Sequence, residues 1–286
     1  MPDNNRPETT RFAPSPSGRL HLGHAHSALF SARAANAGQG GRFLLRIEDI
    51  DNARCRPEFE AAILGDLAWL GLEWETPLRR QSDQLDDYAE ALERLKETGL
   101  LYPCFCTRRD IQEEIARAGA APHGPDGVLY PGLCRGLGEE EAAERIAAGE
   151  AHAWRIDIEE AQRQTGPLRW HDRGRGEIVA EPALLGDAVL ARKDIGTSYH
   201  LAVILDDAEQ EITLVTRGED LFHATHLHRV LQELLGLPVP EWHHHGLLAD
   251  ESGQRLAKRH DALSLSALRE QGQTPTEVRE MAGFPD

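Results

Sequence analysis

Two histidines stand three residues apart at the start of a predicted helix, in the stretch RFAPSPSGRLHLGH that ends at His24. The free backbone N–H groups and the positive dipole end of a helix N-terminus can hold phosphate. His21 and His24 can donate hydrogen bonds to phosphate oxygens whose negative charge grows during a reaction. Gly23 has no Cβ atom, so a flat ring such as adenine can lie against the backbone there. The stretch therefore predicts a nucleotide site with two catalytic histidines.

This stretch resembles the first signature, H-x-G-H, of the class I aminoacyl-tRNA synthetases, and its longer form resembles the glutamate-specific branch of that family. Simple capping or surface histidines at a helix start are the alternative. The resemblance extends over about residues 10–270 and implies that His21, Gly23 and His24 bind ATP. It also implies that glutamate contacts the residues leading into the signature, namely Arg11, Phe12, Ala13, Pro14 and Ser15.

The composition indicates a globular protein rather than a membrane or disulfide-rich secreted one. The chain has 286 residues, of which 40% are apolar, enough for one large domain or two smaller ones. No apolar run approaches the length of a membrane span, and the polar N-terminus lacks the apolar core of a signal sequence. Four cysteines are too few for a disulfide framework, so we expect a reducing, cytoplasmic setting.

The formal net charge of −17 argues against broad, non-specific binding of nucleic acid, because phosphates repel an acidic surface. It leaves room for a local basic surface that grips one structured RNA, while most of the charge serves solubility. We expect a monomer without a membrane partner.

The elements around the signature predict an α/β fold with a Rossmann-like parallel sheet. Apolar patterning predicts strands at Thr10–Ala13 and Arg42–Ile47, with a helix at His24–Ala37 between them. Strand, helix and strand in this order form a right-handed unit, the first half of such a sheet. Two further helices are predicted in this half, one at Pro57–Leu70 and one from the cap residue Ser82 to just before Gly99, followed by a strand at Leu100–Pro103. The second helix is expected to bury a stripe of Leu85, Tyr88, Leu92 and Leu95.

The acidic stretch Glu48-Asp49-Ile50-Asp51 follows the second predicted strand. Ligands of open α/β sheets gather at the carboxyl ends of the strands, so these acids are expected near the signature loop. The resemblance assigns Glu48 to the amino group of the glutamate substrate. For Asp51 we expect a structural role, as a cap of the helix that starts near Pro57.

A candidate metal site begins where the composition shifts, at the C-x-C pair Cys104 and Cys106. Two thiolates one residue apart are poorly placed to bond to each other but can both bind one ion, and Cys134 offers a third. The glutamyl-queuosine tRNA(Asp) synthetases, which the chain resembles, carry C-x-C followed by Y-x-x-x-C, and this implies Tyr130 as the fourth ligand of a structural zinc. His123 is the chemically commoner ligand and remains an alternative. Three free thiols in a surface loop are the other alternative.

The segment from residue 104 to residue 187 interrupts the α/β pattern with polar helices at Arg108–Ala118 and Glu139–Ala148 and short strands within residues 151–181. The resemblance implies an inserted, zinc-bearing subdomain that contacts the acceptor end of tRNA. The predicted domains are a first catalytic half at 1–103, the insertion at 104–187, a second catalytic half at 188–246, and a signature loop with a short helical tail at 247–286.

The α/β pattern then resumes with predicted strands at Ala188–Arg192, Tyr199–Leu205 and Thr213–Val215 and a helix at Leu221–Leu235. The resemblance places Tyr199 and Arg217 in the glutamate pocket. A planar guanidinium clamps a carboxylate with paired hydrogen bonds, so Arg11 and Arg217 are the candidate anion clamps. The alternative for Arg217 is a salt bridge at the strand end, with Glu219 or Asp220.

Two histidine-rich stretches do not predict metal sites. Successive side chains of a strand point to opposite faces, so the three histidines at 243–245 cannot all face one ion, and we expect them at a strand edge. The histidines at 223, 226 and 228 fall on a predicted helix without a suitable carboxylate or thiol nearby.

The stretch QRLAKR at residues 254–259 resembles the second class I signature, K-M-S-K-S. Lys258 matches the lysine that neutralises ATP phosphates, with Mg²⁺, as pyrophosphate leaves. Arg255 and Ala257 replace the first lysine and the serine, and their effect on the loop is left open.

The chain ends at Asp286, and the resemblance then implies that it lacks an anticodon-binding domain. The expected reaction is activation of glutamate with ATP and transfer of the glutamyl group to queuosine at the wobble position of tRNA(Asp). One alternative is the catalytic core of a glutamyl-tRNA synthetase, which charges a tRNA 3′ end. The other is a catalytically silent, zinc-bearing RNA-binding paralogue.

Overall fold

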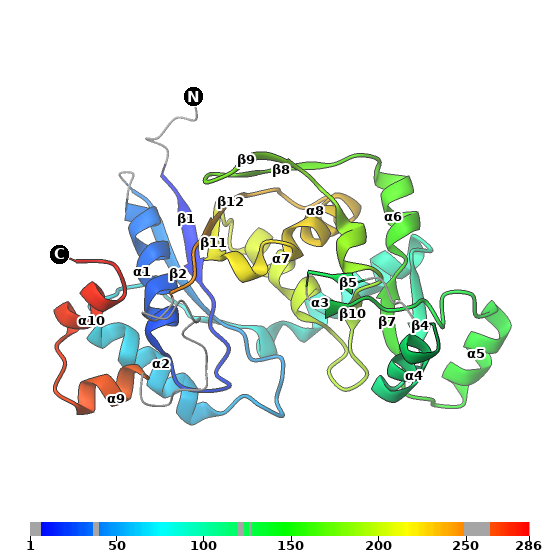
Figure 1. Ribbon diagram of the computed structural model, residues 1–286, viewed down its shortest axis with the longest axis horizontal. Helices are drawn as coiled ribbons and strands as arrows, with labels where there is room; N and C mark the ends of the chain where they lie inside the picture. Colours follow the sequence, from blue (N-terminus) through cyan, green and yellow to red (C-terminus); the bar gives the residue numbers. More distant parts are fainter. Residues whose placement is uncertain (1–6, 37–39, 119–122, 126, 249–263, 286) are drawn as a thin grey trace.

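A computed structural model describes residues 7–36, 40–118, 123–125, 127–248 and 264–285 (Figure 1). The elements from β1 to α2 and the C-terminal helices α9 and α10 lie at one end of the long axis, and most of the segment from β4 to β10 lies at the other. None of the helices in these ranges has the length and apolar character needed to cross a membrane.

The first sheet contains the predicted strand–helix–strand unit. Strands β1 (Thr9–Phe12), β2 (Arg42–Ile47) and β3 (Arg79–Arg80) are parallel in the order β1-β2-β3, and α1 (Leu22–Asn36) connects the first two. Four alanines at helical spacing, at positions 25, 28, 32 and 35, are buried on α1, so the helix can lie close to the sheet. The parallel α/β prediction is confirmed.

The second sheet is formed by later parts of the chain and is also mainly parallel. Its order is β11 (Leu214–Gly218), β12 (Glu241–His245), β8 (Arg169–Asp172) and β9 (Gly176–Val179), and the first three strands are parallel. The backbone N–H of Thr213 donates to the carbonyl of Thr9 at 3.0 Å, so β11 lies beside β1. The histidines at 243–245 therefore belong to an inner strand, and the prediction of a strand edge is wrong.

The predicted strand at Tyr199–Leu205 is a helix, α7 (Tyr199–Glu209). Its central residues Leu201, Ala202, Val203 and Ile204 are all buried, because the helix is enclosed on every side. A short, continuous apolar run is common to a buried strand and a buried helix, so periodicity could not separate the two. The following helix, α8 (Ala224–Leu235), begins after a short 3₁₀ turn, η3 (Glu219–Leu221).

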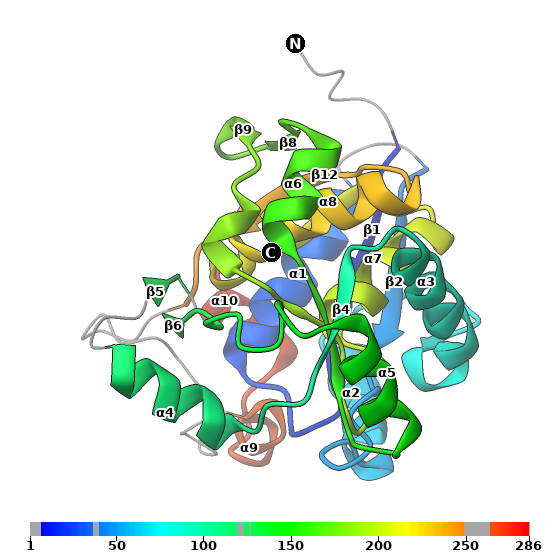
Figure 2. The same cartoon turned by 90° about the vertical axis from the view of Figure 1, so that its right-hand side faces the viewer.

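A separate antiparallel sheet carries the middle of the chain. Its order is β10 (Val189–Ala191), β7 (Ala153–Ile156) and β4 (Leu101–Cys104), so the strand expected at Leu100–Pro103 belongs to this sheet. Around it lie α4 (Arg108–Ala118), the hairpin β5 (His123–Gly124) and β6 (Gly127–Val128), α5 (Glu139–Ala147), α6 (Ile158–Thr165) and the 3₁₀ turn η2 (Pro182–Leu185). Figure 2 looks onto this end of the molecule.

The helix α6 was not expected from the sequence, where only short strands were predicted between residues 151 and 181. Asp157 caps it by accepting a hydrogen bond from the backbone of Glu160 at 3.0 Å. Strands β8 and β9 follow it in the chain, yet they complete the sheet of β11 and β12.

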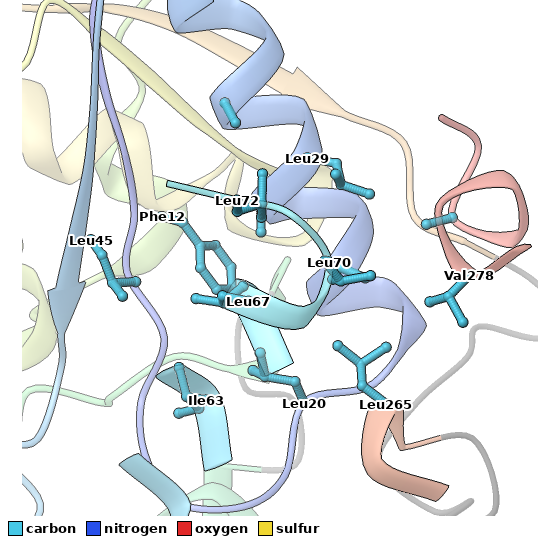
Figure 3. Close-up of a cluster of buried hydrophobic side chains, with 14 of the residues drawn as sticks. Phe12, Leu20, Leu29, Leu45, Ile63, Leu67, Leu70, Leu72, Leu265 and Val278 are labelled. Carbon is cyan, nitrogen blue, oxygen red and sulfur yellow. The ribbon is translucent and has the colours of Figure 1, made fainter. Parts of the chain in front are cut away.

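The C-terminal helices close one side of the first sheet (Figure 3). Leu265 of α9 (Leu265–Glu270) and Val278 of α10 (Pro275–Met281) are fully buried with residues of α1 and α2 (Pro57–Trp69). Thr274 and Glu277 form a capping box at the start of α10. Full burial of each large apolar side chain stabilises the fold by about 1.5–3 kcal/mol, and these contacts hold α10 against α1 and α9 against α2.

Asp51 does not cap α2, contrary to prediction. The residue at that cap is Arg56, which makes no side-chain cap hydrogen bond. The Asp51 carboxylate instead accepts from Arg54 at 2.8 Å and from Arg192 at 3.1 Å, which holds its pKa below the ordinary range despite the opposing effect of burial. Asp51 thus joins the turn after β2 to the loop after β10, a structural role of a different kind.

The predicted cap at Ser82 is also wrong. Ser82 lies in a 3₁₀ turn, η1 (Gln81–Gln84), that precedes α3 (Leu85–Glu97), and its backbone N–H and hydroxyl both donate to Asp49, at 2.8 and 2.6 Å. Leu85 at the start of α3 is 41% exposed, whereas the other three members of the predicted stripe are buried. The α-helix begins at Leu85, two residues later than a cap at Ser82 would place it, and Leu85 is its exposed first residue.

Two adjacent carboxylates of α7 join it to all three strands of the first sheet. Asp206 is fully buried and accepts hydrogen bonds from Arg79 at 2.8 Å, Gln81 at 2.8 Å and Tyr88 at 2.9 Å. These donors come from β3, η1 and α3.

Asp207 accepts from the guanidinium groups of Arg11 on β1 and Arg46 on β2, both at 2.8 Å. Burial alone would raise the pKa of Asp207, but the two arginines hold it below its ordinary range. We call Asp206, Asp207 and these five donors the α7 charge network.

Removal of the Asp206 carboxylate should destabilise the fold strongly. The Asp206→Ala variant leaves buried donors without their acceptor, and breaking a buried pair in this way costs about 3–5 kcal/mol. Urea unfolding should show this loss. The matched control is Glu75→Ala, whose partner Arg42 is 42% exposed, and this change should cost less than about 1 kcal/mol. Equal effects of the two changes would contradict the role of the network.

Candidate active site

A cavity of about 630 Å³ opens at the carboxyl ends of β1 and β11, beside the start of α1. We call it the main pocket. Its lining includes nine residues predicted for the site: Arg11, Phe12, Ala13, His21, Gly23, His24, Glu48, Tyr199 and Arg217. Pro14 does not line it, and Ser15 lines a neighbouring cavity of about 600 Å³ that also reaches the two signature histidines. Lys258, Arg255 and Ala257 lie outside the described residues.

The signature histidines lie stacked, with ring centroids 3.8 Å apart. The backbone N–H of Gly23 donates to Nδ1 of His21 at 3.1 Å, and the backbone N–H of His21 donates to Nδ1 of His24 at 3.2 Å. Both Nδ1 atoms therefore act as acceptors, and each neutral ring carries its proton on Nε2. Both side chains therefore accept backbone hydrogen bonds at the start of the helix, as the capping alternative predicted. The same hydrogen bonds leave the proton of each ring on Nε2, from which it can be donated.

Arg217 is buried in the wall of the main pocket with 6% of its surface exposed. It donates to Nε2 of His244 at 3.1 Å, to the Tyr199 hydroxyl at 3.2 Å and to the Thr225 hydroxyl at 2.6 Å. Burial lowers the pKa of Arg217, although a guanidinium keeps its charge in proteins. Within the described ranges none of its hydrogen-bond partners is a carboxylate, and Glu219 pairs with Arg175 instead.

Arg11 differs from Arg217 in its partners. Two of its nitrogens donate to the Asp207 carboxylate, at 2.8 and 3.3 Å, and a third donates to the carbonyl of Thr216 at 3.2 Å. Arg11 therefore already has a carboxylate partner within the protein, which it shares with Arg46. The sequence analysis treated the two arginines alike, whereas the hydrogen-bond partners of Arg217 within the described ranges include no carboxylate, so a ligand can supply one.

Glu48 brings a negative charge to the same pocket. Its side chain is 13% exposed and accepts a hydrogen bond from Arg46 at 3.2 Å. Burial raises the pKa of Glu48, and the opposing charges of Arg46 and Arg11 do not cancel this effect. A carboxylate near Glu48 would be repelled, whereas an ammonium group would be attracted. Arg217 and Glu48 together suit a zwitterion that carries an extra carboxylate, such as glutamate.

Several pocket residues were not expected from the sequence. They are His26, Ser27, Thr216, Gly218, Asp220, Leu221, His245, Gly246, Leu247 and Leu248. His26 and Ser27 follow the signature by one helical turn, so the helical pattern could have indicated them. His245 ends the inner strand β12 next to β11, and the sequence offered no sign that these strands are neighbours.

The three cysteines predicted to bind metal come together at the end of β4. The sulfur atoms of Cys104, Cys106 and Cys134 all lie within 4.8 Å of one another, and those of Cys106 and Cys134 are 3.4 Å apart. The Tyr130 hydroxyl is 3.3 Å from the sulfur of Cys104 and 3.5 Å from that of Cys106. A tetrahedral zinc site with bonds near 2.3 Å requires donors about 3.8 Å apart, so this set fits such an ion.

Two further residues, His123 and Cys55, are relevant to the composition of this donor set. The side chain of His123 lies outside the described part of the chain, so the choice between it and Tyr130 remains open. Cys55 lies apart from the cluster and contacts Ser15, with its sulfur 3.6 Å from the hydroxyl.

Comparison with known proteins gives consistent results. A family model described as "tRNA synthetases class I (E and Q), catalytic domain" matches residues 8–283. A Glutamyl-Q tRNA(Asp) synthetase of Rhodobacter capsulatus is 52% identical over 96% of this chain and 99% of its own length. One of Nocardia farcinica is 44% identical over 94% of this chain and 81% of its own length.

Among solved structures, the fold is similar to that of a glutamate tRNA ligase from Elizabethkingia meningosepticum in complex with its amino acid. The TM-score is 0.80 at 29% identity, and the match covers 97% of this chain. The present chain spans 60% of the length of that ligase.

The raised pKa of Glu48 predicts that glutamate binding weakens as the pH falls. Protonation of Glu48 begins at a higher pH than in an ordinary glutamate side chain and removes the partner of the ligand's ammonium group. In titration calorimetry, the dissociation constant for glutamate should rise from pH 7.5 to pH 5. The Glu48→Gln variant should bind weakly throughout, with little pH dependence. The exposed control Glu58→Gln should behave as the unaltered chain, and the same pH profile in Glu48→Gln would refute the assignment.

Proposed function

Because this chain belongs to the class I glutamyl- and glutaminyl-tRNA synthetase family, we propose that it activates glutamate with ATP and transfers the glutamyl group to queuosine in tRNA(Asp). The observation that supports glutamate as the substrate is the arrangement of charges in the main pocket. There, Arg217 lacks a carboxylate partner in the described ranges, and Glu48 lines the same pocket. The name of the Rhodobacter capsulatus relative, matched over nearly its whole length, supports queuosine in tRNA(Asp).

In the proposed complex, Arg217 and the Tyr199 hydroxyl bind the side-chain carboxylate of glutamate. Burial raises the pKa of Tyr199, so its hydroxyl stays protonated and can donate. Glu48 binds the ammonium group. The α-carboxylate is then directed toward the ATP site at His21 and His24, which line the same pocket.

In the first step, an oxygen of the glutamate α-carboxylate attacks the α-phosphorus of ATP. The new bond joins that oxygen to phosphorus, and the bond from the α-phosphorus to the bridging oxygen breaks, which releases pyrophosphate. The Nε2–H groups of His21 and His24 donate to the phosphate oxygens as their charge develops. No protein base is needed, because the carboxylate is ionised at neutral pH. Mg²⁺ would enter with ATP as part of the substrate. Neutralisation of the ATP phosphates by Lys258 remains a prediction.

In the second step, a hydroxyl of queuosine attacks the carbonyl carbon of glutamyl-adenylate. An ester bond forms, the bond between the carbonyl carbon and the AMP oxygen breaks, AMP leaves, and the hydroxyl proton is released to water. The competing function is charging of a tRNA 3′ end, which the similarity to a glutamate tRNA ligase favours. A cytoplasmic setting, a monomeric state and an acceptor-binding role for the middle segment likewise remain predictions.

Glutamate transfer to end-blocked tRNA separates the two acceptors. A tRNA(Asp) that ends in 2′,3′-dideoxyadenosine has no terminal hydroxyl to acylate, so labelled glutamate should still enter it when it contains queuosine. The matched control is the same tRNA without queuosine, which should remain unlabelled. Labelling of intact, queuosine-free tRNA that disappears on end-blocking would instead establish 3′ charging. Absence of glutamate-dependent ATP–pyrophosphate exchange would establish a silent paralogue.

The proposal includes a structural zinc ion held by Cys104, Cys106 and Cys134, with Tyr130 as the fourth donor. Its support is the convergence of three sulfurs and a phenol oxygen at the spacing described above. Burial, together with the neighbouring thiols, raises the pKa of the Cys106 thiol to about 12, so the isolated cluster would stay largely protonated. A bound cation would favour the thiolates and order the loop between β6 and α5.

Metal analysis of the purified protein tests this part of the proposal. The chain should contain one zinc ion, and Cys106→Ala should lose it with a fall in Tm. Cys55→Ala is the matched control and should retain both. Loss of zinc in Tyr130→Phe but not in His123→Ala would support Tyr130 as ligand. The opposite result would assign His123, and a zinc-free native protein would refute the site.

A further inference from the structure

The acceptors that hold Arg217 form an unusual set for a buried guanidinium. Buried arginines are ordinarily balanced by carboxylates, as Arg11 is by Asp207. Around Arg217, the acceptors are instead two hydroxyls and an imidazole, with Nδ1 of His228 at 3.4 Å as a further contact. The side chain is thus fixed in direction while its charge remains uncompensated by these partners.

His244 is itself oriented by a buried carboxylate. Its Nδ1 atom lies 2.7 Å from the carboxylate of Asp172, and both side chains are fully buried. Asp172 also accepts from the backbone N–H groups of His244 at 3.1 Å and Gly174 at 2.9 Å. Since the carboxylate is an acceptor, Nδ1 of His244 carries the proton and Nε2 presents a lone pair. That lone pair accepts the Nε–H of Arg217.

The opposite tautomer of His244 is incompatible with this arrangement. A proton on Nε2 would face the Nε–H of Arg217, placing two donors against each other at 3.1 Å. Burial and the charge of Arg217 lower the pKa of His244 to about 3, so the ring is neutral at physiological pH. Asp172 thus determines which nitrogen of His244 meets the arginine.

We propose that Asp172 and His244 are positioning residues that hold Arg217 through an uncharged acceptor and so reserve its positive charge for the side-chain carboxylate of the amino-acid substrate. This inference rests on the proposed function. It assigns selectivity for glutamate over glutamine to the absence of a charge-balancing carboxylate at Arg217. Arg11, with Asp207 beside it, shows how the same side chain is held where its charge is balanced within the protein.

Two substitutions of His244 separate its two hydrogen bonds. The His244→Asn side chain can reach Asp172 but is too short to reach Arg217. The His244→Gln side chain can place its amide oxygen near the Nε2 position and accept from Arg217. In glutamate-dependent ATP–pyrophosphate exchange, His244→Asn should raise the KM for glutamate about 10- to 100-fold, the loss of one hydrogen bond to a charged group. The KM for ATP should stay within about twofold, and His244→Gln should recover part of the glutamate KM.

Asp172→Asn tests the orienting carboxylate by a different change. Without the ionised acceptor the imidazole is no longer held as the Nδ1–H tautomer, so the KM for glutamate should rise and the preference for glutamate over glutamine should fall. The double variant Asp172→Asn/His244→Asn should be no worse than His244→Asn alone, because both changes act through one contact.

His243→Asn is the matched control, since His243 lies on the same strand but packs against Phe30 with ring centroids 4.8 Å apart. It should leave the KM for glutamate unchanged. A folded His244→Asn variant with an unaltered KM for glutamate would overturn the inference. So would a parallel rise of the KM for ATP, which indicates general damage. Absence of exchange in the unaltered chain would refute the proposed function as well, so the two failures are distinguishable.

Discussion

The α7 charge network is the constraint on which the rest of the site depends. Asp206 and Asp207 stand near the C-terminal end of a buried helix, where the dipole disfavours negative charge. They are stable there because arginines from β1, β2 and β3 surround them. These contacts place the other end of α7, with Tyr199, opposite the strand ends that carry Glu48 and Arg217.

The network also divides the arginines of the pocket into two kinds. Arg11 and Arg46 have a structural role, because their guanidinium groups form ion pairs with Asp207. Arg217 is held by hydroxyls and by His244, so its charge remains to be balanced by a ligand. In the proposed complex, a dicarboxylic amino acid supplies a carboxylate to Arg217, and its ammonium group meets Glu48. Under this proposal, the electrostatic selection of the substrate follows from how the protein pairs its own buried charges.

Local patterns in the sequence were sufficient for the first half of the sheet, and the family resemblance supplied much of the pocket. Arg11, the proline-rich turn and the H-x-G-H stretch are contiguous, and the parallel pairing of β1 with β2 brings Glu48, at the end of β2, near them. The helix α7 was missed because an enclosed helix and an enclosed strand share one apolar signature. The sequence also did not show that Arg11 and Arg217 have different hydrogen-bond partners. Each partner is distant in sequence: Asp207 binds Arg11, and His244 binds Arg217.

A crystal structure with a non-hydrolysable glutamyl-adenylate analogue would locate both substrates at once. We expect the side-chain carboxylate at Arg217 and Tyr199, the ammonium group at Glu48, and the adenine against the backbone at Gly23. The phosphate mimic should lie within hydrogen-bond distance of the Nε2 atoms of His21 and His24. An analogue bound outside the main pocket, or bound with its side-chain carboxylate on Arg11 and away from Arg217, would show that the proposed placement of glutamate is wrong.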